Sequence, residues 1–202
     1  MAKRSSRKRS DIESEDSGSK KLWLIIGAIV IGVVGLGALI YFNQKPVEAI
    51  NQVVRYPGQE REHNAALEYD FDPLPPVGGS HSPAWQNCGI YDEPVLPENA
   101  IHSMEHGAVW VAYQEDLPED QVAMLRDEVQ GKTFVLLSPY PNLQSPVIVS
   151  AWGLQMEADS AEDGRIAEFI DRYRVGPQTP ERGAACTGGR RICGGRSMRW
   201  RV

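Results

Sequence analysis

The hydrophobic positions divide the chain into one unbroken apolar run near the N-terminus and several shorter amphipathic segments beyond it. The run, LWLIIGAIVIGVVGLGALIYF, extends from Leu22 to Phe42 and holds 21 residues without a charge. At ~1.5 Å per helical residue, it matches the roughly 30 Å hydrocarbon core of a bilayer. A core helix of a small domain would show a polar face, and a cleavable signal would have a shorter apolar stretch before a small-residue cleavage site. We therefore expect a retained transmembrane helix over residues 22–42.

The charges around this run predict its orientation. Residues 1–21 contain seven basic and four acidic residues, are rich in serine and lack apolar periodicity, which is typical of a disordered tail. Basic residues before a span favour the cytoplasmic side of the membrane. We expect a single-pass cell-membrane protein with a signal anchor, a cytoplasmic N-terminus and an extracytoplasmic domain. Ala28 and Gly32 lie four residues apart, a spacing compatible with helix pairing and hence with a homodimer.

Beyond the anchor, we expect a linker over residues 43–68 and a long loop over residues 69–99. The loop is rich in proline and glycine, which disfavour regular structure, and its aromatic side chains favour an ordered conformation because they offer large areas to bury. The pattern then predicts, in order, a helix, a strand, a helix, two strands and a helix, over residues 98–106, 108–113, 117–130, 134–137, 147–152 and 160–174. Residues 154–156 are expected to continue the last strand.

This order predicts an α+β fold, a small two-layer α/β sandwich. The strand–helix–strand unit would be parallel and the two later strands would form an antiparallel hairpin, so a ferredoxin-like arrangement is one candidate. The domain would occupy residues 69–189, followed by a flexible basic tail over residues 190–202. Beyond residue 21 the chain carries 14 basic and 23 acidic residues. Such an acidic body repels phosphate backbones, so we expect no nucleic-acid partner. Any protein partner is left open.

The segment AIHSMEHGAVW places His102 and His106 four residues apart, directly before an apolar strand. On a helix the two imidazoles share one face and can reach one metal ion. The order of residues differs from the HExxH of zinc proteases, because Ser103 stands where the catalytic glutamate would follow the first histidine. Hydrolysis by that mechanism is therefore not indicated. Met104 would join the site only if the backbone were extended or irregular.

Two further candidate ligands lie upstream, His81 in SHSPAW and Cys88 in QNCGIY. His81, Cys88, His102 and His106 would suit a tetrahedral zinc or a copper site. Sulfur from Cys88 or Met104 would favour copper, so we place copper before zinc. A histidine pair that only caps helices and bonds to backbone is the alternative. His63 is interpreted as an ordinary surface histidine.

The three cysteines, Cys88, Cys186 and Cys193, allow three single bridges in an oxidising compartment. A Cys88–Cys186 disulfide would fasten the end of the chain to the domain. Alternatively, Cys88 would remain a thiol ligand beside the histidines. The sequence leaves both open.

Three longer segments, PPVGGSHSPAWQNCGIYDEPVLPENAIHSMEHGAVWVAY, LLSPYPNLQSPVIVSAWG and GPQTPERGAACTGG, occupy residues 75–113, 136–153 and 176–189. Through them the chain resembles an uncharacterised bacterial family of membrane-anchored or exported proteins, catalogued as domain of unknown function 3105. The resemblance implies that His81, Cys88, His102, His106 and Cys186 belong to the family pattern, in which leucine is more usual where this chain has Met104. It implies no reaction. It does support treating the loop and the histidine pair as one site, and a Cys88–Cys186 disulfide is compatible with it.

Three functions remain in view. The first is an extracytoplasmic protein that binds or delivers a transition metal rather than catalysing a reaction. The second is a cell-envelope interaction module with structural histidines. The third is a copper-dependent redox enzyme built on the same histidines.

Overall fold

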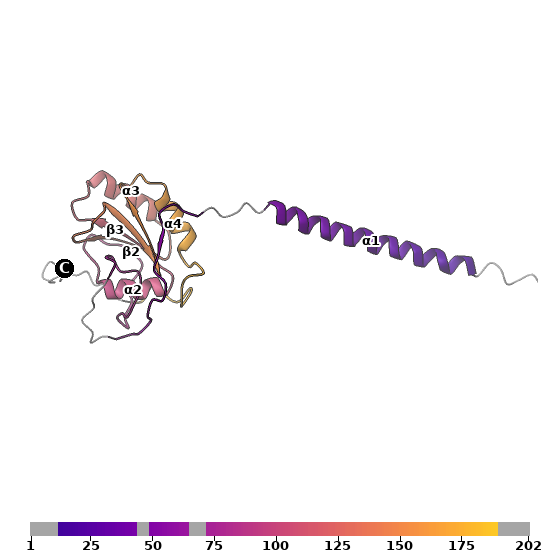
Figure 1. Ribbon diagram of the computed structural model, residues 1–202, viewed down its shortest axis with the longest axis horizontal. Coiled ribbons are helices and arrows are strands. Elements are labelled where there is room, and N and C mark those ends of the chain that lie inside the picture. Colours follow the sequence, from indigo (N-terminus) through magenta and orange to yellow (C-terminus); the bar gives the residue numbers. More distant parts are fainter. Residues whose placement is uncertain (1–11, 44–48, 65–71, 190–202) are drawn as a thin grey trace, which may run out of the picture. The chain divides into compact units, whose positions relative to one another are not determined.

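The computed structural model describes residues 12–43, 49–64 and 72–189, and the chain divides into two compact units, Met1–Ala49 and Ile50–Val202 (Figure 1). The first unit contains helix α1 (Ile12–Asn43). Its segment Lys20–Leu39 has a mean hydropathy of 2.6 and is not buried, so among the described residues α1 is the helix long and apolar enough to cross a membrane. A signal sequence would satisfy the same criteria of length and composition.

Helix α1 begins at Ile12, ten residues before the predicted span. The expectation of disorder is therefore wrong for residues 12–21. Glutamate and lysine are good helix formers, and they extend a helix once the apolar run has nucleated it. The expectations for residues 1–11 and for the tail 190–202 lie outside the described residues.

The second unit is built on one mixed sheet, which confirms the α+β class. Its strands are β1 (Val54–Arg55), β2 (Gly89–Ile90), β3 (Val109–Gln114), β4 (Val135–Tyr140), β5 (Val147–Ala151) and β6 (Leu154–Ala158), and its helices are α2 (Pro97–Glu105), α3 (Glu119–Val129) and α4 (Arg165–Tyr173). The strand order is β1-β6-β5-β3-β4-β2. The short strands β1 and β2 thus fall within the predicted linker and loop.

The connections differ from the predicted topology in two places. Strands β3 and β4, joined through α3, are parallel neighbours. In a ferredoxin-like split β-α-β unit another strand lies between these two, so that arrangement is wrong. The predicted hairpin of β4 and β5 is also wrong, because β5 pairs with β3 and β6 instead. Gly153, with a φ of +67°, reverses the chain between β5 and β6, so residues 154–156 form a new strand.

Helices cover both faces of the sheet, so the domain has three layers rather than the predicted two. On one face Val111 of β3 belongs to a core cluster with Leu125 of α3 and Phe169 of α4. On the other, Trp110 belongs to a cluster with Met104 of α2. Figure 1 shows α2 on the opposite side of the sheet from α3. A strand covered on both faces is apolar at every position rather than at alternate ones, as AVWVAY is.

Gly107, which follows the end of α2, makes a close backbone contact that predicts its sensitivity to substitution. Its φ is +116°, and a Cβ placed on it would lie 3.0 Å from the Cα of Val175. We expect Gly107→Ala to lower the free energy of unfolding by about 1–3 kcal/mol or more, because the strained φ adds to a contact with backbone that cannot move aside. Chemical unfolding of the full-length protein in detergent measures the loss.

Gly131→Ala is the matched control. Gly131 also has a positive φ, +76°, but a Cβ there would meet nothing within 4 Å. Equal losses in the two variants would show that the approach to Val175 contributes nothing.

Candidate metal centre

Helix α2 packs in the core with one face and carries candidate metal ligands on another. Ile101 and Met104 are fully buried and pack in the core cluster beneath the sheet face that carries Trp110. His102, Glu105 and the next residue, His106, follow the spacing i, i+3, i+4, so they share a different face of the helix. The Met104 sulfur therefore lies in the core and not among the candidate ligands. Its prediction as a possible ligand is not supported by this placement.

A short contact between two loop segments adds the other histidines. His63 and His81 form a parallel β-bridge, in which Asn64 N donates to His81 O and His81 N donates to Glu62 O, both at 2.9 Å. The bridge brings the His63 and His81 rings to a centroid distance of 4.6 Å. His63 is thus part of the site, and its interpretation as an ordinary surface histidine is wrong.

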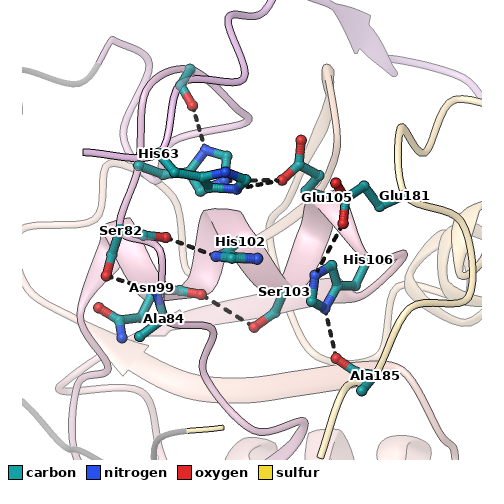
Figure 2. A network of polar contacts seen from close by, with 12 residues as sticks. His63, Ser82, Ala84, Asn99, His102, Ser103, Glu105, His106, Glu181 and Ala185 are labelled. Atoms are coloured by element: carbon teal, nitrogen blue, oxygen red, sulfur yellow. Dashed lines mark hydrogen bonds and ion pairs between the residues drawn. The ribbon is translucent and has the colours of Figure 1, made fainter. Parts of the chain in front are cut away.

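Four side chains form what we call the His–Glu cluster: His63, His81, His102 and Glu105. Figure 2 shows His63, His102 and Glu105 from close by. One possible ligand atom from each lies within 4.8 Å of all the others. The Nε2 atoms of His63 and His81 are 3.0 and 3.1 Å from the same Glu105 oxygen, Oε2. His81, His102 and Glu105 are buried, whereas the side chain of His63 is 36% exposed. Three members of the cluster are therefore shielded from solvent by the protein, and solvent reaches the cluster at His63.

Backbone carbonyls orient the rings of the buried histidines. The Nδ1 of His81 donates to Gly79 O and that of His102 donates to Ser82 O, both at 2.7 Å. Because a carbonyl oxygen can only accept, each Nδ1 carries the hydrogen and each neutral ring keeps its lone pair on Nε2. Metal-binding histidines are commonly held by a hydrogen bond of this kind.

The charges at the cluster favour a bound cation. With Nδ1 occupied, the Nε2 of His81 can bring only a lone pair or an added proton, and it faces the acceptor Oε2 of Glu105 in a buried environment. Two acceptors at this distance require a proton or a metal ion between them. Burial and, to a lesser extent, the neighbouring histidines lower the pKa of His102 to about 4, against the opposing effect of the hydrogen bond to the Ser82 carbonyl. His102 is therefore neutral at pH 7, with its Nε2 lone pair free to bind a metal.

The structure contains a disulfide between Cys88 and Cys186, whose Cα atoms are 5.4 Å apart. Cys88 N also donates to Cys186 O at 2.8 Å. A sulfur in a disulfide is not a thiolate, the form of cysteine that binds metals, so Cys88 is not a ligand in this structure. The donors of the cluster are three imidazole nitrogens and one carboxylate.

The predicted histidine set is brought together only in part. His106 is not a member of the four-residue cluster, although its ring lies 4.6 Å from that of His102. Its Nδ1 donates to Ala185 O at 2.6 Å, and its Nε2 is 3.6 Å from Oε2 of Glu181. Glu105 was missed as a ligand, although its position on the face of His102 was a usable signal. No local pattern marks His63, which stands in the polar segment REHNAA.

These observations define a class: an α+β domain that gathers three histidines and a glutamate from two loop segments and one helix. The family model described as "Protein of unknown function (DUF3105)" matches residues 61–188, and the chain belongs to this family. The matched range includes every residue of the His–Glu cluster and both cysteines of the disulfide. No curated protein and no solved structure matched the chain.

Proposed function

We propose that this protein is a membrane-anchored, extracytoplasmic metal-binding protein that holds one divalent transition-metal ion in the His–Glu cluster. The observation that carries the proposal is the gathering of one possible ligand atom from each residue of the His–Glu cluster within 4.8 Å of the others. The Nε2 atoms of His63 and His81 meet the same oxygen of Glu105, and backbone carbonyls hold the Nδ1 atoms of His81 and His102. The chain contains four histidines, and all four lie in the cluster or beside it. Histidines that served only as surface residues would not be expected to lie together in this way.

The spacing of the donors supports the same interpretation. Metal–nitrogen bonds of ~2.0–2.1 Å in a tetrahedral site place neighbouring ligand atoms roughly 3.3–3.5 Å apart. The cluster has contacts of 3.0 and 3.1 Å and a largest separation of 4.8 Å, which bracket that range. Small side-chain rotations would close the site around an ion, with His63 moving most freely because it is the exposed member.

The donor set changes the argument for copper. The sulfur atoms that favoured copper are absent from the cluster, so copper(I) loses its preferred ligands. Imidazole and carboxylate donors suit copper(II) and zinc, and divalent copper binds such sites more tightly than zinc does. We therefore keep copper before zinc in affinity. A site that opens to solvent at one ligand favours reversible binding or delivery of the ion over turnover.

The anchored, extracytoplasmic location is proposed from the apolar segment of α1 and from the disulfide. Disulfides persist in oxidising compartments and are rare in the cytosol. The basic residues before the span favour an N-terminus in the cytoplasm, which supports this proposed orientation.

Metal content of the untagged full-length protein tests the proposal. The protein is purified in detergent, stripped with a chelator, loaded with Cu²⁺ or Zn²⁺ alone and passed through gel filtration before elemental analysis. We expect one retained equivalent of either ion. His81→Ala and His102→Ala should each weaken binding by at least about 100-fold, since loss of a group that merely supports a ligand already costs ~10–100-fold.

The carboxylate offers a matched pair of variants. Glu105→Gln removes the buried charge of the cluster, whereas Glu119→Gln makes the same change on the exposed surface of α3. We expect weaker binding only in Glu105→Gln. A wild-type protein that binds neither ion at micromolar concentrations, and whose stability does not depend on metal, would leave the histidines structural and overturn the proposal.

A further inference from the structure

A second histidine–glutamate pair lies beside the His–Glu cluster. We call His106 and Glu181 the outer pair. His106 is buried, and its Nδ1 donates to Ala185 O, so Nε2 is the ring nitrogen that can offer a lone pair to a metal ion. That Nε2 lies 3.6 Å from Oε2 of Glu181, whose side chain is half exposed (Figure 2). The pair therefore repeats the arrangement of His81 and Glu105, in which a histidine Nε2 faces a carboxylate oxygen, but at an opening to solvent.

Backbone contacts hold the outer pair in place. Glu181 N donates to Glu105 O at 2.9 Å, and Gly183 N donates to His106 O at 3.0 Å. These bonds fasten the segment that carries Glu181 to the last turn of α2. The Cys88–Cys186 disulfide fastens the same segment a few residues later. The position of Glu181 beside His106 thus follows from the fold of the backbone.

The separation of 3.6 Å suits a metal ion better than a direct hydrogen bond. Hydrogen bonds from nitrogen to oxygen are typically ~2.7–3.2 Å long. A metal ion with bonds of ~2.0–2.2 Å to each atom, at angles of about 110–120°, would hold them roughly 3.3–3.7 Å apart. The outer pair therefore has the spacing of two ligands of one ion, with solvent completing the coordination.

The ring of His102 belongs to the cluster and is also next to the outer pair. Its centroid is 4.6 Å from that of His63 in the cluster and 4.6 Å from that of His106 in the outer pair. Trp85 lies against both His102 and His106, with centroid distances of 5.7 and 5.3 Å. An ion at the outer pair would consequently lie beside a ring that is itself a proposed ligand of the cluster.

We infer that the outer pair is a second, weaker binding position for a divalent transition metal, adjacent to the His–Glu cluster and facing solvent. The inference rests on the proposed function, because it assigns the second ion to the same metal-binding face of α2. Binding is weaker here because the protein supplies two ligands instead of four. A second position of this kind gives an ion a site to occupy on its way between solvent and the cluster.

Calorimetric titration of zinc into the metal-free, untagged full-length protein in detergent tests this inference. We expect two binding steps in the wild type, the second at least about 10-fold weaker than the first because it has fewer protein ligands. Glu181→Gln and His106→Ala should each abolish the second step. Glu119→Gln, an exposed change on α3, should retain both steps. Glu181→Gln alters a half-exposed side chain, so it guards against a folding defect in His106→Ala.

The possible results distinguish failure of the second binding position from failure of the proposed function. A single step in the wild type overturns the second position and leaves the cluster standing. Two steps that persist in both Glu181→Gln and His106→Ala overturn it as well, because the second ion then binds elsewhere. Uptake of no zinc overturns the second position, and the proposed function falls with it only if the protein takes up no copper either.

Discussion

Replacement of Cys88 and Cys186 by serine is expected to lower the free energy of unfolding of the domain by about 4–5 kcal/mol. The disulfide joins residues 98 apart in the sequence. In the chain-entropy description, a closed loop of about 100 residues restricts the unfolded chain by ~4.7 kcal/mol. Small domains commonly have a total stability of only ~5–15 kcal/mol, so loss of this disulfide would remove a large part of the free energy of unfolding.

The measurement is chemical unfolding of the double variant against its parent, both carrying Cys193→Ser so that a third thiol cannot exchange. A loss below about 1 kcal/mol would contradict the expectation, because the bridge would then restrict an unfolded chain that is already compact. The same variant links stability to the site. Ala185, whose carbonyl holds His106, adjoins Cys186. Zinc titration of the double variant should therefore retain the first binding step and lose the second, since His106 belongs to the outer pair.

Truncation of Met104 should be the other large effect. Met104 is fully buried in the core cluster with Ile101 and Trp110. Met104→Ala is expected to cost about 2–5 kcal/mol, the range for truncating a buried methionine or leucine to alanine. Met104→Leu nearly conserves volume and should cost less than about 1.5 kcal/mol. Thermal unfolding of the metal-free proteins measures both.

Metal binding by these two variants distinguishes a core residue from a ligand. If Met104 only packs, Met104→Leu should bind one tight equivalent of copper or zinc with the affinity of the wild type. If the Met104 sulfur were a ligand, the leucine variant would lose copper affinity while remaining stable. That outcome would contradict the placement of Met104 in the core. It would also restore the argument for copper that depended on soft ligands.

Local patterns predicted most of the secondary structure because they reflect short-range rules. The apolar run predicted a helix long enough to span a membrane, and the 3.6-residue period predicted α3 and α4. The same period placed His102 and His106 on one face of α2, a face that also carries Glu105. Strand partners could not be predicted in the same way. Gly153 reverses the chain in a segment that otherwise has the composition of one strand, and β5 pairs with β3 through contacts between distant residues.

The residues of the candidate site likewise divide into those that the sequence could identify and those that only tertiary contacts bring in. His81 and the pair on α2 were recognisable because they stand close together in the sequence. His63 could not be recognised, because only the bridge between two loop segments brings it to His81. Glu181 joins His106 through hydrogen bonds between segments separated by most of the domain. Neither contact has a counterpart in composition or spacing.

By itself, therefore, the sequence determined the apolar segment, the helices, the strands β3, β4 and β5 and the shared face of α2, because each depends on residues a few positions apart. It also reduced the disulfide to three possible pairs. Only the tertiary structure decided that Cys88 bonds to Cys186, that Met104 belongs to the core, and that His63 and Glu105 converge with His81 and His102. The physical reason is that a pairing of distant segments depends on how the whole chain buries its apolar surface, which no local pattern contains.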